Sequence, residues 1–209
     1  MARPRMSHSQ ERLSELFLGV LDTDADGTVS VDEVLQRAGD RGYGFLLILL
    51  AIPAFIPVLP PGTSTILGLL MSLIALQMLW GRAVPWLPAR WRRHRLAPQT
   101  VMALQTRGVA ILRQLERISR PRGRWLVRNG FMLRWHALLV IFMALVLSSP
   151  LPFLNTLPAL GVLLIGIGLM NHDAYFLAAG NLIALVLAFL VGTSFHLLVE
   201  AVREVLKVF

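Results

Sequence analysis

The chain has 209 residues, of which 56% are hydrophobic and only 15% charged, and its mean hydropathy is +0.65. A soluble domain of this size is more polar, so the composition predicts an integral membrane protein. The absence of cysteine excludes thiol catalysis, disulfides and cysteine-ligated metal.

The charge distribution predicts an orientation in the membrane. Residues 1–42 carry eight of the twelve acidic groups against five arginines, whereas residues 82–135 carry thirteen arginines and only Glu116 as an acid. Basic loops shorter than ~60 residues stay in the cytoplasm. We therefore expect a multi-pass membrane protein with the 82–135 segment cytoplasmic and in contact with anionic lipid headgroups. This explanation is simpler than a nucleic-acid site, which we do not expect.

The N-terminal region, residues 1–41, begins with an amphipathic helix predicted from Ser9 to Leu21, where apolar residues recur at helical spacing. One face of this helix is apolar. A helix this short can lie on the membrane surface or dock on the rest of the protein, and the sequence does not separate the two.

Residues 22–33, Asp-Thr-Asp-Ala-Asp-Gly-Thr-Val-Ser-Val-Asp-Glu, resemble an EF-hand calcium loop at each diagnostic position. Calcium takes six to eight oxygen ligands. The loop offers the carboxylates of Asp22, Asp24, Asp26 and Glu33 and the carbonyl oxygen of Thr28. EF-hands ordinarily pair, however, and the chain holds no second such loop. The alternative is a solvated acidic turn between two amphipathic helices.

The first hydrophobic region, residues 42–81, contains no charged side chain and is interrupted by a proline-rich break, Pro53–Gly62. At ~1.5 Å of rise per residue, Tyr43–Leu59 and Thr63–Trp80 each match the ~30 Å core of a bilayer or fall slightly short of it. A Pro-Pro-Gly turn at bilayer depth must be shielded by protein or line a wet cavity. The region therefore predicts a helical hairpin that either re-enters the membrane or spans it.

The rest of the chain repeats this plan. The basic loop, residues 82–130, contains a second amphipathic helix at about Gln99–Ser119, which can rest on anionic lipid in the interface. A second broken hydrophobic hairpin follows at 131–173, and residues 174–209 supply a C-terminal transmembrane helix.

Sliding the sequence by 93 residues aligns the two breaks, because Pro57 falls on Pro150, Thr63 on Thr156 and Gly68 on Gly161. We predict an all-α integral membrane protein with two repeats, at about 8–82 and 99–173, of an amphipathic helix plus a proline-broken hairpin. The alternative is that any two hairpins of one chain look alike. Such repeats are typical of transporters, whose sites lie where the breaks meet.

This register predicts a substrate or ion path of polar, proline and glycine residues near the breaks: Pro57, Pro60, Pro61, Gly62, Thr63, Ser64, Gln77, Asn155, Thr156 and Asp173. We predict no catalytic residue. The hydrophobic segments hold no carboxylate pair or metal cluster at membrane depth, so general acid–base chemistry lacks its groups.

The motifs around the breaks also carry a family resemblance. The stretch from Ile52-Pro53 to Thr65, the run Ala75-Leu-Gln-Met-Leu-Trp-Gly-Arg82, and Pro85-Trp-Leu-Pro88 are followed by Pro150-Leu-Pro-Phe153 with Asn155, Pro158 and Asp173. Together they resemble the signatures of the ExoD exopolysaccharide-synthesis family of bacterial membrane proteins, over about residues 10 to 200. The acidic loop is fuller than the family's turn, so calcium does not carry over.

The resemblance implies a role in exopolysaccharide production at the inner membrane. Our leading hypothesis is a transporter, a flippase or an accessory component that handles polysaccharide or its lipid-linked precursor, either as a monomer or as an oligomer. The competing hypothesis is a structural or sensory membrane protein whose N-terminal loop responds to calcium and which moves no substrate.

Overall fold

The computed structural model describes residues 13–23, 27–55, 62–82, 84–116, 123, 129–149 and 155–208. These residues are mostly helical, and the one pair of strands among them is very short. In chain order the elements are α1 (Leu13–Val20), β1 (Val29–Ser30), α2 (Val31–Ala38), η1 (Gly39–Arg41), α3 (Gly42–Phe55), α4 (Thr63–Leu79), α5 (Ala89–Arg92), β2 (Arg95–Leu96), α6 (Pro98–Ala103), the π-helical η2 (Leu104–Gly108), α7 (Val109–Glu116), α9 (Gly130–Ser148), α10 (Thr156–Asn171) and α11 (Ala174–Val208).

The predicted hairpins form an antiparallel four-helix bundle in which α4 packs mainly on α9 and α3 mainly on α10. The Thr65 hydroxyl, in the first turn of α4, donates to the carbonyl of Ser148, the last residue of α9, over 3.1 Å. Likewise Gly44, near the start of α3, lies against Gly166 and Met170 in the second half of α10. The ends that flank the two breaks therefore lie at the same end of the bundle.

Glycines allow these helices to approach closely. A Cβ placed on Gly44 would lie 2.6 Å from the carbonyl oxygen of Gly166 and 2.7 Å from the backbone nitrogen of Met170. In the other pair, a Cβ on Gly68 of α4 would lie 2.5 Å from the carbonyl oxygen of Ala144 in α9. Small residues at such contacts are characteristic of helices that pack in a bilayer.

A layer of amphipathic helices covers the outer side of α3. We call α1, α2, α6, η2 and α7 the polar layer. The rings of Phe17 in α1 and Phe45 in α3 lie 5.0 Å apart, and Gly108 of η2 lies against Ile52 of α3. Residues 42–48 are buried as a result, although an apolar helix of a membrane hairpin would ordinarily face lipid on one side. The N-terminal amphipathic helix docks on protein.

The opposite face of the bundle is apolar and exposed. Ile66 and Leu69 of α4 and Leu138 and Leu145 of α9 are each about half exposed or more. Together with the polar layer, this face makes the two sides of the bundle chemically different.

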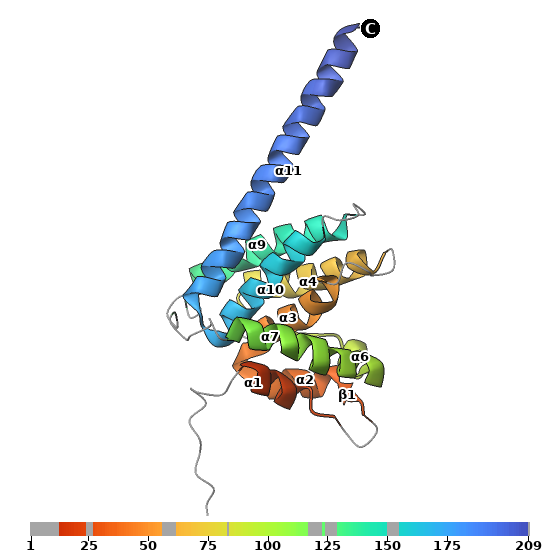
Figure 1. The fold of residues 1–209 in the computed structure, drawn as a ribbon, viewed down its shortest axis with the longest axis vertical. Helices are drawn as coiled ribbons and strands as arrows, with labels where there is room; N and C mark the ends of the chain where they lie inside the picture. Colours follow the sequence, from red (N-terminus) through yellow and green to blue (C-terminus); the bar gives the residue numbers. More distant parts are fainter. Residues whose placement is uncertain are drawn as a thin grey trace, which may run out of the picture.

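Helix α11 reaches well past the bundle. Its first part packs on α10, where Leu177 lies against Gly168 and Gly180 against Gly161. Leu187 is the last residue of α11 that is buried among those described, and residues 188–197 are all exposed. Figure 1 shows α11 extending beyond the other helices, with α1, α2 and β1 at the opposite end of the molecule.

Among the described residues, two helices are long and apolar enough to cross a membrane, judged by length and composition: α9 and the Ala174–Leu197 part of α11. Helix α11 continues beyond this apolar part to Val208. Its last turns alternate charged and apolar residues, which extends the helix past the hydrophobic stretch.

The antiparallel pairing of β1 with β2, in which Val29 faces Leu96 and Ser30 faces Arg95, was not predicted. It joins the acidic N-terminal region to the basic loop. This pairing is the only departure from an all-α fold among the described residues.

Candidate functional site

The predicted path residues at the breaks lie at one end of the bundle. Gly62 precedes α4 with a φ of 90°, and Thr63 and Ser64 are half-buried in its first turn. Asn155 and Thr156 begin α10, and the buried Oδ1 of Asn155 has no hydrogen-bond partner among the described residues. Pro57, Pro60 and Pro61 lie outside the residues that the structure describes.

Two other predicted path residues lie at the opposite end of the bundle. The buried Gln77 is fourteen residues beyond Thr63 in α4, which is about 21 Å along the helix axis. Its Oε1 accepts the backbone N–H of Trp86 over 2.6 Å. Asp173 is buried just before α11, where its Oδ1 accepts the N–H of Tyr175 over 3.0 Å. The structure thus divides the predicted path into two groups.

A buried polar pair joins α9 to α11. His136 is 2% exposed, and its Nδ1 lies 2.5 Å from the carbonyl of Met132. That short contact indicates that Nδ1 carries the proton, so Nε2 accepts from the Asn181 amide at 3.5 Å. The packing of α11 against α9 buries His136.

Sequence reasoning did not find the cavity between α2 and the segment that follows α4. It has a volume of about 450 Å³, within the range of small-molecule sites. It is lined by Asp32, Leu35, Gln36, Arg82, Val84, Pro85, Trp86, Leu87 and Arg92. The available signal was the pair Arg82 and Trp86 directly after a hydrophobic helix, which the sequence analysis used only as part of the family motifs.

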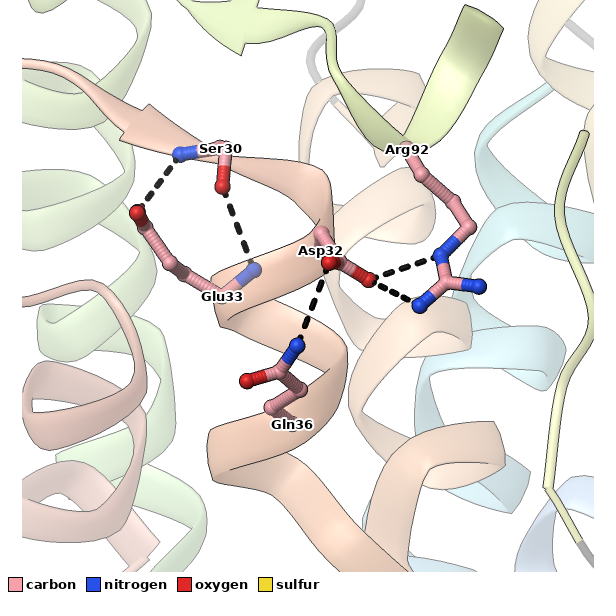
Figure 2. Close-up of polar contacts among 5 residues, drawn as sticks. All are labelled: Ser30, Asp32, Glu33, Gln36 and Arg92. Atoms are coloured by element: carbon pink, nitrogen blue, oxygen red, sulfur yellow. Dashed lines mark hydrogen bonds and ion pairs between the residues drawn. The ribbon is translucent and has the colours of Figure 1, made fainter. Parts of the chain in front are cut away.

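The polar wall of this cavity is an ordered cluster. The Asp32 carboxylate accepts from Arg92 through Nε at 2.7 Å and Nη2 at 2.5 Å, and from the Gln36 amide at 3.1 Å (Figure 2). On the other wall, the Arg82 guanidinium lies 5.9 Å from the centre of the Trp86 ring, which is a cation–π contact.

The acidic loop beside this cluster is partly described. Ser30 and Glu33 form a capping box at the start of α2: the Glu33 N–H donates to the Ser30 hydroxyl over 3.2 Å, and the Ser30 N–H donates to the Glu33 carboxylate over 3.0 Å (Figure 2). The backbone hydrogen bond from Ser30 lowers the pKa of Glu33 below its ordinary value.

The other loop residues have different surroundings. The carbonyl of Asp22 accepts from Arg37 over 2.6 Å, and the Thr28 hydroxyl accepts from Arg95 over 3.0 Å. Asp24 and Asp26 lie outside the described residues. A calcium ion would be held by the carboxylates of Asp22 and Glu33 and the Thr28 carbonyl among the described groups. The Glu33 carboxylate would then coordinate the cation in place of its hydrogen bond from the Ser30 N–H.

An apolar bundle with an exposed apolar face and two helices long enough to cross a bilayer fit a helical membrane protein. The chain belongs to the ExoD family, described as exopolysaccharide synthesis, whose family model matches residues 13–193.

Two relatives agree with this assignment. The chain is 31% identical over 191 residues to Protein ExoD of Rhizobium meliloti, a match that covers 90% of this chain and 77% of the relative. It is also 27% identical over 210 residues to an uncharacterized protein of Synechocystis sp., covering 97% of this chain and 98% of the relative. No solved structure matches the chain.

Proposed function

We propose that the protein supports the synthesis or export of exopolysaccharide at a bacterial inner membrane, as a transporter or flippase-like component. Family membership supports the role in exopolysaccharide synthesis or export. The arrangement of the hairpins supports a transporter or flippase-like activity in three steps.

The first step is internal symmetry. Helix α4 starts at Thr63 and α10 at Thr156. These two starts differ by the 93 residues of the sequence register. The first helix of each hairpin also packs on the second helix of the other, as a two-fold relation between repeats requires. Both breaks lie at the same end of the bundle, so the two-fold axis relating the two repeats would run parallel to the long axis of the bundle.

The second step compares the lengths of the helices with the thickness of the bilayer core. The 17 residues of α4 and the 16 of α10 extend about 25 Å and 24 Å, whereas the 24 apolar residues of α11 extend about 36 Å. Residues 188–197 of α11 continue about 15 Å past its last buried residue. The α4 and α10 halves of the hairpins are thus shorter than the ~30 Å core, which supports the re-entrant alternative, while α9, at 19 residues, is long enough to span it.

The third step is the position of the polar layer. Glu15, Arg37 and Arg113 are exposed on the helices that cover α3, and lipid tails do not solvate such groups. The polar layer therefore stands outside the hydrocarbon core, and we assign it to the cytoplasm from the basic 82–135 segment. In this proposal the bundle that the layer covers, with Gly62, Thr63, Ser64, Asn155 and Thr156 at one end, lies within the membrane.

The amount of lipid-linked precursor that accumulates in cells tests this function. In a bacterium whose own copy is deleted, we expect secreted polymer to fall and the precursor to accumulate on the cytoplasmic side, and the intact gene to restore both. Asn155→Leu should not restore export at equal protein level, whereas Ser194→Ala, on the exposed part of α11, should. Loss of polymer with no accumulated precursor would indicate a role in synthesis and contradict transport.

A calcium-responsive loop is the second candidate function. The observation that favours it is the β1–β2 pairing, since part of the same chain stiffens the loop where EF-hands ordinarily use a second loop. Affinity should be weak, near the ~10⁻⁴–10⁻³ M of extracellular modules.

The calcium test uses a substitution that preserves the capping box. Glu33→Gln removes one carboxylate ligand but keeps a side chain that can complete the box. We expect millimolar calcium to raise the melting temperature of the intact protein and of Glu15→Gln, which lies outside the loop, but not of Glu33→Gln. No rise in the intact protein would leave the loop as a solvated acidic turn.

A further inference from the structure

The cavity beside α2 combines two kinds of wall. Leu35, Val84, Pro85, Leu87 and the Trp86 indole supply apolar surface; Arg82 lies over the Trp86 ring, and Arg92 lies on the polar wall with Asp32. Trp86 is held in place, because its backbone N–H donates to the buried Gln77 amide of α4. The aromatic wall is therefore set before any ligand arrives, which lowers the entropic cost of binding.

The charges on the walls do not cancel. Asp32 is the one carboxylate that lines the cavity, and its oxygens already accept three N–H groups, two from Arg92 and one from Gln36. Arg82 makes no ion pair with any residue that the structure describes, and its contact is with the face of Trp86. The cavity thus keeps one guanidinium whose N–H donors are available to a ligand, and a second that Asp32 orients.

We propose that this cavity binds a phosphate ester, with the phosphate at Arg82 and Arg92 and the organic part on Trp86. A guanidinium fork matches phosphate geometry, and the several phosphate oxygens can accept from two arginines at once. The site follows directly from the end of α4, where the exposed Trp80 and Trp86 are typical of the headgroup level of a membrane. It does not depend on whether the protein transports a substrate.

Two sources supply this chemistry: a phospholipid headgroup and a soluble sugar phosphate. Binding is measured on the purified full chain with two probes, glucose 1-phosphate in solution and phosphatidylcholine vesicles with or without phosphatidylglycerol. The variants are Arg82→Ala and Trp86→Ala. The matched control is Arg90→Ala, which removes the same charge from an exposed arginine of the same segment that does not line the cavity.

Loss of charge-assisted hydrogen bonds should weaken binding about tenfold or more in Arg82→Ala, and the control should retain affinity. Trp86→Ala should weaken binding as well. Saturable binding of glucose 1-phosphate with this pattern supports a soluble ligand, and the same pattern only on anionic vesicles supports a lipid. Equal losses in Arg82→Ala and Arg90→Ala, or no saturable binding of either probe, would overturn the proposal. Unchanged melting temperatures establish that the variants fold.

Discussion

Gly44 shows how single residues set the distance between helices in this bundle. Any side chain there meets backbone atoms of α10, which cannot move aside as a flexible side chain would. Gly192 is a matched control, since it also lies in a helix but a Cβ there would have no neighbour within 4 Å.

We expect Gly44→Ala to destabilise the protein by about 1–3 kcal/mol through overpacking. Gly192→Ala should be neutral or stabilise by up to about 1 kcal/mol, because alanine is the better helix former. Thermal unfolding of both variants in the same detergent checks this. Equal melting temperatures would mean that α3 and α10 are not in contact at Gly44.

The capping box at Ser30 and Glu33 predicts a pH dependence of α2. The pKa of Glu33 is lower in the folded than in the unfolded chain, so its contribution to stability is present above the unfolded pKa, near ~4.3. That contribution is lost as the pH falls through the folded pKa. Hydrogen exchange, corrected for intrinsic rates, should show reduced protection of residues 31–38 in acid. Glu33→Gln should not show this acid-dependent loss, because glutamine carries no charge to titrate.

Contacts between individual residues were the part of the structure that the sequence predicted least well. Gln77 was chosen for the path because it is polar and lies at membrane depth, yet its partner is a backbone N–H that only the turn after α4 brings within reach. The Arg82–Trp86 contact and the Asp32–Arg92 pair were missed for the same reason. Residues that meet through loop geometry leave no periodic signal.

Helical elements were far more predictable. The apolar run that follows the Pro-Pro-Gly turn correctly predicted the start of α4 at Thr63. The pattern did not show whether the apolar face of each amphipathic helix packs on lipid or on protein, because both environments favour the same apolar stripe. The structure shows that Val101, Leu104 and Leu112 of the α6–α7 run are buried by protein.

The docking of α1 on α3 can be tested through Phe17. This ring is fully buried against Phe45, and Phe17→Ala should cost about 3–5 kcal/mol and loosen the polar layer. Limited proteolysis should then cleave residues 13–41 faster. Met102→Ala, at a side chain that is 65% exposed, should leave the cleavage rate unchanged. An unchanged cleavage rate in Phe17→Ala would mean that the layer is held by other contacts.

The arrangement of the whole molecule predicts its topology. The polar layer and the C-terminal half of α11 lie at opposite ends (Figure 1), so a cytoplasmic layer places the end of α11 in the periplasm. The chain contains no cysteine, so single introduced cysteines can be labelled without background. In intact cells, an impermeant reagent should label Lys207→Cys and not Arg113→Cys. Labelling of Arg113→Cys would reverse the orientation.

The pairing of α3 with α10 also has a consequence for biogenesis. Gly44 meets Gly166, so the first hairpin leaves the ribosome long before its main partner has been made. Until then the α10-facing side of α3 has only lipid or an insertion factor to cover it. Contacts so distant in sequence form slowly. Translation that stalls within the basic 82–130 segment should therefore leave a membrane intermediate that quality-control proteases recognise, even though every residue of the first hairpin is present.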